Sequence, residues 1–236
     1  MNKLFNPNIR LVRESHKYIL STNPDLEFIS ATTFISQFFE KFEAEKIAKK
    51  LVSVSPKYMG MSVEDVLAMW RESANHGTIV HEELEEHILN QSELKEPKAI
   101  QGMNWLNKYK MKSDFKVYPE VIIYSEELGI SGTIDLLLFD KNSNNYIIMD
   151  WKTSKKIDTK SYRNKRGILP ASSNIADTKF NHYALQLSLY RYLLEEYYNI
   201  EITQHLILHL KDEKCEGLHV PYMKNNIIKM IQTLRS

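Results

Sequence analysis

The sequence predicts an α/β sandwich, in which a central mixed sheet contains an antiparallel meander and helices cover both faces, with a helical N-terminal part. Three observations support this prediction. From about residue 111 the apolar residues change from helical spacing to three β-rich runs separated by short polar turns. Both faces of these runs are apolar, which is typical of strands covered by helices on both sides. Helical patterns precede the runs, and a helix, a strand and a closing helix follow them.

Residues 1–110 are expected to be mostly helical. Short extended segments, broken at Asn6-Pro7 and Asn23-Pro24, occupy the first 30 residues. Hydroxyl side chains at 30–33 then offer N-caps for an apolar face at helical spacing, formed by Phe34, Ile35, Phe38, Phe39 and Phe42. Further helices are predicted at about 63–73, 78–89 and 97–109, and Gly77 marks a break between the first two.

Residues 111–236 are expected to form the core sheet and its helices. Strands are predicted at 116–124, 130–139, 145–152 and 205–210. A loop covers about 153–178, and helices are predicted at 180–198 and 224–234. No repeat, low-complexity tract or linker divides the chain, so a single domain of 236 residues is expected.

Composition narrows the class of protein. The chain is 43% hydrophobic and 26% charged, as soluble globular proteins are. No apolar run approaches the roughly 20 residues that span a bilayer, and the N-terminus lacks the apolar core of a signal peptide. The single cysteine, Cys215, lies in a polar run, is expected at the surface, and excludes an internal disulfide. We therefore expect an intracellular protein that is neither secreted nor membrane-bound. The net charge of +1 neither supports nor excludes a polyanionic partner, so only local charge can indicate one.

Three acids are spaced 15 residues apart, one in each strand of the predicted meander: Glu120, Asp135 and Asp150. Opposed residues in an antiparallel pair have a constant sum of residue numbers. Pairing each acid with the next centres both turns inside the polar loops. In that register the carboxylates lie side by side on one face, with neighbouring Cβ atoms about 4.5–5.5 Å apart.

This arrangement points to a metal site. Adjacent carboxylates repel one another and lose solvation, so a purely structural sheet avoids them. A divalent cation removes that cost, and carboxylate oxygens suit Mg²⁺. Lys152 points to the same face as Asp150, where its ammonium can orient water and stabilise charge on a phosphate. The alternative is a surface sheet with ordinary charges, but the apolar residues around these acids favour a functional site.

The residues then resemble a known superfamily. Gly132-Thr-Ile-Asp135, Asp150-Trp-Lys152 and Gln186-Leu-Ser-Leu-Tyr190 resemble the core motifs of PD-(D/E)XK nucleases. Gly77-Thr-Ile-Val-His81 is similar to the histidine motif of the RecB-like branch, and the chain is similar there to the mitochondrial genome maintenance exonuclease and related phage and viral exonucleases. The likeness runs from about residue 30 to 210. It implies a restriction-endonuclease-like fold and one nuclease domain over residues 1–236.

The resemblance implies a role for each motif residue. The metal ligands are His81, Asp135 and Asp150. The catalytic residues are Lys152, Asp135 and Asp150, assisted by Glu120, Gln186 and Tyr190. The cofactor is Mg²⁺, for which Mn²⁺ substitutes. Ile134 stands where the superfamily often has proline, and Asp150 stands where it often has glutamate; both variants leave the chemistry intact.

The nucleic-acid contacts are expected mainly in the basic stretch from residue 152 to 166. Taken alone, such a run is as often an ordinary solvated loop, but its position directly after Lys152 favours phosphate binding. The expected contacts are Lys155, Lys156, Arg163 and Arg166, with Thr33 at a helix N-terminus and Tyr190. Some aromatic side chains would stack on unpaired bases, but the sequence does not select them.

The implied activity is hydrolysis of DNA by metal-activated water, with 5′-phosphate products, by an exonuclease on single-stranded ends. The helical N-terminal third and the basic loop would form a cover through which a strand threads. A binding module with a decayed site, a structural protein with a coincidental acidic sheet, and a restriction-type endonuclease are the alternatives. Recombination, repair, replication-end processing and phage or viral genome maintenance all fit.

Overall fold

The described chain begins with a small hairpin that packs on the main sheet. The computed structural model describes residues 3–235. After a short 3-10 helix, η1 (Lys3–Phe5), the strands β1 (Ile9–Val12) and β2 (Lys17–Leu20) pair antiparallel. Buried side chains of the hairpin pack against Tyr124 of the main sheet, which fixes the hairpin to the body of the protein.

Within residues 3–235 the main sheet has six strands: β3 (Ile29–Ser30), β4 (Phe115–Ser125), β5 (Ile130–Asp140), β6 (Asn145–Lys152), β7 (Ile202–Leu210) and β8 (Cys215–His219). The strands β4, β5 and β6 form the predicted antiparallel meander. β7 runs parallel to β6, and β8 runs antiparallel to β7. β3 adds a short parallel pairing to the start of β5. The predicted mixed sheet is therefore confirmed.

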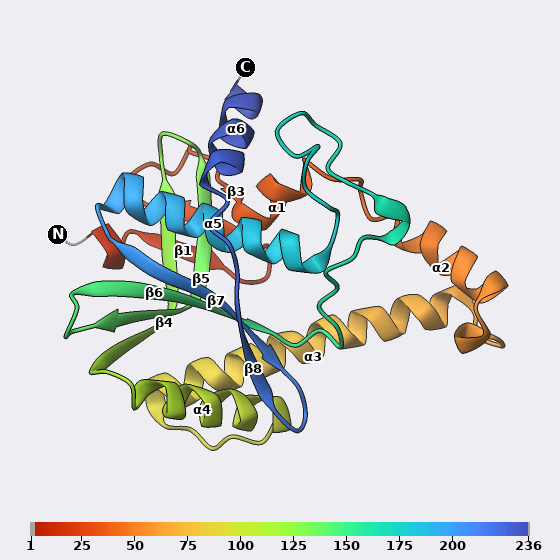
Figure 1. The fold of residues 1–236 in the computed structure, drawn as a ribbon, viewed down its shortest axis with the longest axis horizontal. Helices are drawn as coiled ribbons and strands as arrows, with labels where there is room; N and C mark the ends of the chain where they lie inside the picture. The colour runs from red at the N-terminus through yellow and green to blue at the C-terminus, as the bar shows by residue number, and fades with distance from the viewer. Residues whose placement is uncertain (1–2, 236) are drawn as a thin grey trace.

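Helices cover both faces of this sheet (Figure 1). One face carries α1 (Ala31–Ser36), α5 (Lys179–Tyr198) and α6 (Lys224–Arg235), and the other carries α3 (Val63–Asn90) and α4 (Pro97–Lys110). Alternate strand residues enter opposite cores, because successive side chains of a strand point to opposite faces. Leu137 and Ile148 join the first core, whereas Leu136 and Met149 join the second. The predicted α/β/α sandwich is confirmed, and every helix of the described chain is too short or too polar to cross a lipid bilayer.

The register of the meander is the one that the sequence predicts. The pairs on either side of Glu120 place it opposite Asp135. The last pair between β5 and β6, Leu136 with Met149, places Asp135 opposite Asp150 at the next step. Regular pairing is nevertheless interrupted at each acid, because the backbone of Glu120 is left-handed and the β5–β6 ladder ends just before Asp135 and Asp150.

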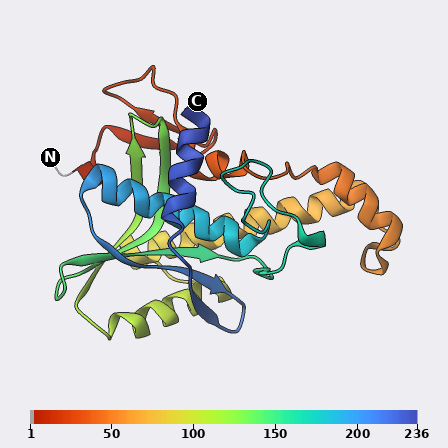
Figure 2. The same ribbon diagram turned by 45° about the horizontal axis from the view of Figure 1, so that its top comes forward.

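The break predicted at Gly77 is wrong, because α3 is one continuous helix of 28 residues. A Cβ atom at position 77 would lie 2.9 Å from Thr153 Oγ1. The glycine therefore lets the helix pass close to the end of β6, and it does not end the helix. A capping box of Ser62 and Asp65 starts α3. The N-terminal half of the helix projects beyond the sheet (Figures 1 and 2).

The segment 37–62 differs most from the sequence expectation. α1 ends at Ser36, and Phe38 and Phe39 enter the core from a turn rather than from a longer helix. An unpredicted helix, α2 (Ala44–Val54), follows and leads to a 3-10 turn, η2 (Pro56–Tyr58). α2 lies against the outer end of α3 (Figure 2). Its apolar residues recur at helical spacing, and Lys49 pairs with Glu45 one turn earlier, so the segment carried a local helix signal that the sequence analysis missed.

The strand β8 is a further addition to the predicted fold. The polar run around Cys215 forms this strand by pairing with β7. Cys215 is partly buried and packs against the second core, so the expectation of a surface thiol is wrong. The reason is that pairing with a neighbouring strand, not local hydrophobicity, places this segment.

Candidate active site

The predicted acids come together where β5 and β6 separate. β6 leaves β5 after Met149 and continues beside β7. α3 and α5 cover opposite faces of the sheet, yet both reach the acids. His81 Nδ1 of α3 lies 3.5 Å from Asp135 Oδ2, and Gln186 Nε2 of α5 lies 3.4 Å from Asp150 Oδ1. The opening between the two strands gives both helices access to the same group of carboxylates.

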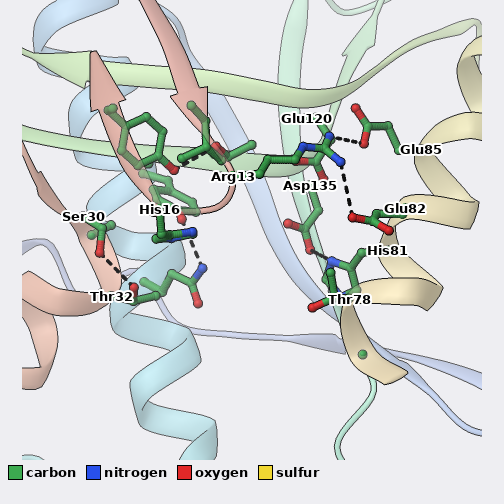
Figure 3. Close-up of a pocket in the computed structure, with 18 residues that line it drawn as sticks. Arg13, His16, Ser30, Thr32, Thr78, His81, Glu82, Glu85, Glu120 and Asp135 are labelled. Atoms are coloured by element: carbon green, nitrogen blue, oxygen red, sulfur yellow. Dashed lines mark hydrogen bonds and ion pairs between the residues drawn. The ribbon is translucent and has the colours of Figure 1, made fainter. Parts of the chain in front are cut away.

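His81, Glu120 and Asp135 form a compact cluster at this opening (Figure 3). One ligand atom from each side chain lies within 4.8 Å of the other two. An imidazole nitrogen and two carboxylate oxygens are donors that suit a divalent cation, so these residues fit a metal. Asp150, the remaining predicted ligand, lies outside this cluster because its carboxylate is turned toward Lys152.

Glu120 joins the cluster through a strained backbone. Its φ of 48° lies in the left-handed region, which residues with side chains adopt at a cost on the order of 1–3 kcal/mol. This conformation interrupts the β4–β5 pairing at that one residue. Burial and the nearby Asp135 carboxylate raise the pKa of Glu120 to about 8. A cation at this place would favour the charged form and so offset both effects.

Asp135 and His81 are held ready for a ligand. Trp151 N donates a hydrogen bond to Asp135 Oδ2 at 2.8 Å, which fixes the carboxylate in the opening. Burial raises the pKa of Asp135, although the charge of Lys152 opposes this. Burial and Lys152 lower the pKa of His81 to about 4. His81 is therefore neutral near pH 7 and keeps a nitrogen lone pair for a cation.

Asp150 and Lys152 form a closed ion pair beside the cluster. Lys152 Nζ lies 2.5 Å from Asp150 Oδ2, and Asp150 is 1% exposed. Burial raises the pKa of Asp150 to about 6 against the charge of Lys152. Burial alone would lower the pKa of Lys152, but the carboxylates of Asp150 and Asp135 outweigh it and the pKa is raised. Lys152 is therefore a cation near pH 7.

Gln186 and Tyr190 support this ion pair from α5. They lie one helical turn apart, and Gln186 Nε2 donates to Tyr190 Oη at 3.1 Å while it approaches Asp150. A Cβ atom at position 132 would lie 2.4 Å from the Tyr190 ring. Gly132 therefore allows the ring to rest directly against β5. Gly132 and Tyr190, which belong to two different sequence motifs, therefore contact each other.

A pocket of about 440 Å³ contains the carboxylates of the cluster, and we call it the cluster pocket. Arg13, in the turn between β1 and β2, reaches into it (Figure 3). Its guanidinium lies 2.7 Å from Glu85 and 3.5 Å from Glu82, both on α3. Further polar lining comes from His16, Tyr18, Ser30, Thr32 and Thr78.

A second cavity of about 770 Å³, the basic groove, contains Lys152. Its other lysines are Lys57, Lys98, Lys155 and Lys179. Its aromatic side chains include Tyr58, Trp70 and Tyr183. His81 lines both the groove and the cluster pocket, so the two cavities meet at the cluster.

The loop of residues 153–178 lines the basic groove at its start, from Thr153 to Lys155, and farther along it is tied to the chain between α1 and α2. Ile168 N donates to Phe38 O at 2.9 Å, and Lys165 forms an ion pair with Glu40. The loop reaches from the end of β6 toward α2, on the same side as the projecting half of α3 (Figure 2). The groove therefore has walls that come from distant parts of the sequence.

A model of the PD-(D/E)XK nuclease superfamily matches residues 43–220, well over half of the chain. The chain belongs to the PD-(D/E)XK nuclease superfamily. No curated protein sequence matches it. Among solved structures, the crystal structure of SSO0001 is 17% identical with a TM-score of 0.38, and the likeness covers 89% of this chain and 77% of that chain. Membership of the superfamily implies a metal-dependent nuclease, and the sandwich agrees with a restriction-endonuclease-like fold.

In this PD-(D/E)XK nuclease the basic loop does not act as one surface. Lys155 lines the groove beside Lys152. Lys156 instead forms an ion pair with Asp158 at 2.7 Å. Arg163 lies over a tyrosine ring of the loop, and Arg166 donates to a loop carbonyl. The predicted contacts of the loop are thus separated, with Lys155 alone of the four lining the groove in the described residues.

The remaining predicted contacts are also separated. Thr33 belongs to the cap of α1, where its backbone N donates to Ser30 Oγ at 3.1 Å. The neighbouring Thr32, not Thr33, lines the cluster pocket. Tyr190 lines that pocket too, but it is 3% exposed, which suits a supporting contact better than base stacking.

The sequence did not indicate several residues around the site, including Arg13, Lys57, Trp70 and Lys98. They come from the hairpin, η2, α3 and α4, and only the packing of these elements brings them to the cavities. A local signal did exist for Tyr183. It precedes Gln186 by three residues, so the two side chains share one face of α5.

Proposed function

We propose that this nuclease is a Mg²⁺-dependent exonuclease that hydrolyses single-stranded DNA from its ends and leaves 5′-phosphates. The observation that carries the proposal is the walled basic groove, which meets the metal-binding cluster at His81. Mn²⁺ is expected to replace Mg²⁺, since the same oxygen and nitrogen donors suit both ions.

The lining of the groove favours an unpaired strand. Its lysines can follow the phosphates of a backbone, which gives affinity that falls with salt. Its aromatic side chains, Tyr58, Trp70 and Tyr183, can stack on bases only where the bases are unpaired. A cationic groove with aromatic platforms is the usual means of binding single strands without sequence preference.

The side chains of the site have different roles in the proposed hydrolysis. His81, Glu120 and Asp135 hold the cation, and we propose Asp150 as the further ligand, opposite Asp135. When bound, the cation supplies Lewis-acid activation of water and of the scissile phosphate. Lys152, with its raised pKa, donates hydrogen bonds that orient the attacking water and stabilise charge on the phosphate.

The walls of the groove support action at strand ends. Contacts join the loop 153–178 to the chain between α1 and α2, and α2 packs on α3. We propose that a strand threads between these walls to reach the cluster. A closed circle has no end to thread, so it should resist cleavage.

A comparison of linear and circular single-stranded DNA of the same sequence tests the proposal. With Mg²⁺ or Mn²⁺, the end-labelled linear strand should be degraded and the circle should persist. EDTA or Lys152→Ala should abolish the activity, whereas Lys156→Ala, outside the groove, should leave it unchanged. Cleavage of both forms at equal rates would rule out threading. No cleavage with either metal would favour a nucleic-acid-binding module with a decayed site.

We further propose that the nuclease belongs to the RecB-like branch, near the mitochondrial genome maintenance exonuclease and its phage and viral relatives. Support comes from His81 beside the acids and from Gln186 and Tyr190 behind Asp150. We also propose that residues 1–236 work as one nuclease domain, because both cavities take residues from the N-terminal part and from the core sheet.

A further inference from the structure

The cluster pocket meets the basic groove at His81, and the part of its lining beyond the metal ligands, on the β1–β2 hairpin and the start of α1, has no role in the proposed hydrolysis. We propose that it is a product subsite, which binds the short end of the DNA strand beyond the scissile phosphate. The inference rests on the proposed function, since it concerns the same strand and the same cluster. It adds a binding site to which the β1–β2 hairpin, the start of α1 and α3 contribute.

The position of the cluster requires two strand-binding regions. A phosphate that is cut at His81, Glu120 and Asp135 has nucleotides attached on both sides. The basic groove holds the nucleotides on one side, because it meets the cluster at His81 and contains Lys152. The cluster pocket meets the same histidine and contains the two carboxylates. It is therefore the cavity into which the other side of the strand leads.

The lining of the pocket suits a sugar and a phosphate. Arg13 has five N–H donors in a planar fork, of which Glu82 and Glu85 engage only part. Its side chain is 55% exposed, so the remaining donors can meet an anion. The guanidinium offsets one of the two negative charges of Glu82 and Glu85, and a cation held by Glu120 and Asp135 would offset the charges of those two carboxylates. The hydroxyl groups of Thr32 and Thr78 can form hydrogen bonds with a sugar or with a phosphate.

The volume of the pocket limits what it can hold. About 440 Å³ lies in the range of roughly 300–1,000 Å³ that small-ligand sites occupy. The bound end is therefore of the size of a mononucleotide or dinucleotide. The hairpin turn with Arg13 and His16 bounds the pocket opposite α3 (Figure 3), so the wall of the hairpin determines how much strand passes the cluster before each cut.

A substitution that fills the pocket tests this role. Thr32→Trp places an indole at the pocket wall, and Ser36→Trp is the matched control, since Ser36 is exposed on the same helix and lies outside the pocket. The probe is 5′-phosphorylated thymidine dinucleotide, whose binding in Mg²⁺ is measured by equilibrium dialysis. Product lengths are measured on linear single strands labelled at either end.

Thr32→Trp should weaken binding of the dinucleotide by about tenfold or more and shift the lengths of the released products, whereas Ser36→Trp should change neither. Unchanged affinity and product lengths in folded Thr32→Trp protein would overturn the proposal. His16→Asn is a second variant, because asparagine tolerates the φ of 50° at this position while removing the imidazole. It should also weaken binding of the dinucleotide, and unchanged affinity in both variants would overturn the subsite.

The two proposals fail in different ways. Cleavage of circular strands would contradict the exonuclease, yet the dinucleotide would still bind in the cluster pocket and depend on Thr32. Conversely, if the Thr32 and His16 variants remain exonucleases with unchanged product lengths and unchanged affinity for the dinucleotide, the exonuclease proposal stands and the product subsite is wrong.

Discussion

The two halves of the active site differ in how their charges are satisfied. On one side, His81, Glu120 and Asp135 face a cavity, and the pKa of each carboxyl group is raised by burial. On the other side, Asp150 and Lys152 form a buried ion pair with Gln186 behind it. In the first half, the protein chain alone does not supply enough positive charge to balance the two carboxylates. In the second half Asp150 already has the charge of Lys152 beside it, although burial still raises the pKa of Asp150 to about 6.

This difference indicates that one half binds the cation, whereas the other half holds Lys152 in position before the substrate arrives. The open half gains most from a cation, because the ion relieves repulsion between Glu120 and Asp135. The closed half keeps Lys152 charged and in place, so that no rearrangement of charge is needed when a phosphate arrives. Substitutions in each half and the pH dependence of stability test this difference.

Removal of the lysine should have the largest effect. Lys152→Met should lower the rate of hydrolysis by at least about 10²–10³-fold, since it removes a preorganised donor. It should also lower the free energy of unfolding by about 3–5 kcal/mol near pH 8, because Asp150 is left as an unpaired buried charge. Single-turnover kinetics and urea denaturation measure the two effects.

Glu120→Gln provides the opposite case. It should also reduce the rate, but the metal-free protein should become more stable, since an uncompensated buried acid is removed. Lys156→Met is the exposed control and should change stability by less than about 0.5 kcal/mol. A loss of stability in both Lys152→Met and Glu120→Gln would contradict the distinction between the halves.

The stability of the metal-free protein should fall as pH rises from about 6.5 to about 8, the range in which the two buried histidines no longer titrate. The pKa of Glu120 is about 8 in the folded protein against 4.5 as its ordinary value, so between these values the folded state binds more protons than the unfolded state. Stability from this group is complete below pH 4.5 and is lost as pH rises through 8, with a slope of up to about 1.4 kcal/mol per pH unit. Below about pH 6.5, Asp150, with a pKa of about 6, acts in the same direction, whereas His81 and His205, whose pKa values are lowered to about 4, act in the opposite direction.

Thermal denaturation between pH 5 and pH 9, with EDTA and with Mg²⁺, measures this dependence. Mg²⁺ should flatten the curve, because a cation binds the charged carboxylates and stabilises the folded state. Glu120→Gln should flatten it in EDTA as well. A metal-free protein whose stability rises between about pH 6.5 and about pH 8 would contradict the predicted sign.

The support of the closed half can be tested at Gly132. In Gly132→Ala the new methyl group meets the Tyr190 ring, so either the ring or β5 must move. The free energy of unfolding should fall by about 1–3 kcal/mol, as in other overpacked cores. The rate of hydrolysis should fall with it, because Tyr190 holds Gln186 beside Asp150.

Gly77→Ala is the matched control for this substitution. Its methyl group meets only the hydroxyl of Thr153, and alanine favours the helix by up to about 1 kcal/mol. Stability should therefore change less than in Gly132→Ala. Equal losses in the two variants, measured by urea denaturation, would show that Gly132 has no special contact with Tyr190.

The smallest effect is expected in the basic groove. Lys155→Ala should weaken binding of single-stranded DNA and reduce the slope of log affinity against log salt by about 1, because one phosphate contact is lost. Lys156→Ala should leave the slope unchanged, since Lys156 pairs with Asp158 and lies outside the groove. Fluorescence anisotropy at several salt concentrations distinguishes the two variants. Equal slopes would place the strand outside the groove.

The core sheet was predictable because its pattern is local. Glu120, Asp135 and Asp150 lie in strands joined by short turns, and turn length together with strand alternation determines the register. The expected site on one face follows from that register. Neither the left-handed backbone of Glu120 nor the separation of β5 and β6 has a local signal, so the open cluster of His81, Glu120 and Asp135 appears only in the structure.

The helical region was less predictable because its contacts are distant. Gly77 suggested a helix end, but its purpose is a close approach to Thr153, 76 residues later in the chain. The helix α2 is an exception, because its apolar residues recur at helical spacing and this local signal was missed. Arg13 reaches the cluster pocket only because the hairpin folds back on the sheet.

The continuity of α3 also limits how this chain can change in length. Trp70 in the groove and His81 at the cluster lie on the same rigid helix, with no loop between them to absorb an added residue. One inserted residue turns everything after it by about 100° around the helix axis and advances it by about 1.5 Å. Substitutions between these positions leave the histidine aimed at the acids, but a single insertion or deletion turns it away. Among descendants of this gene, the eleven-residue spacing from Trp70 to His81 should vary less than the residues within it.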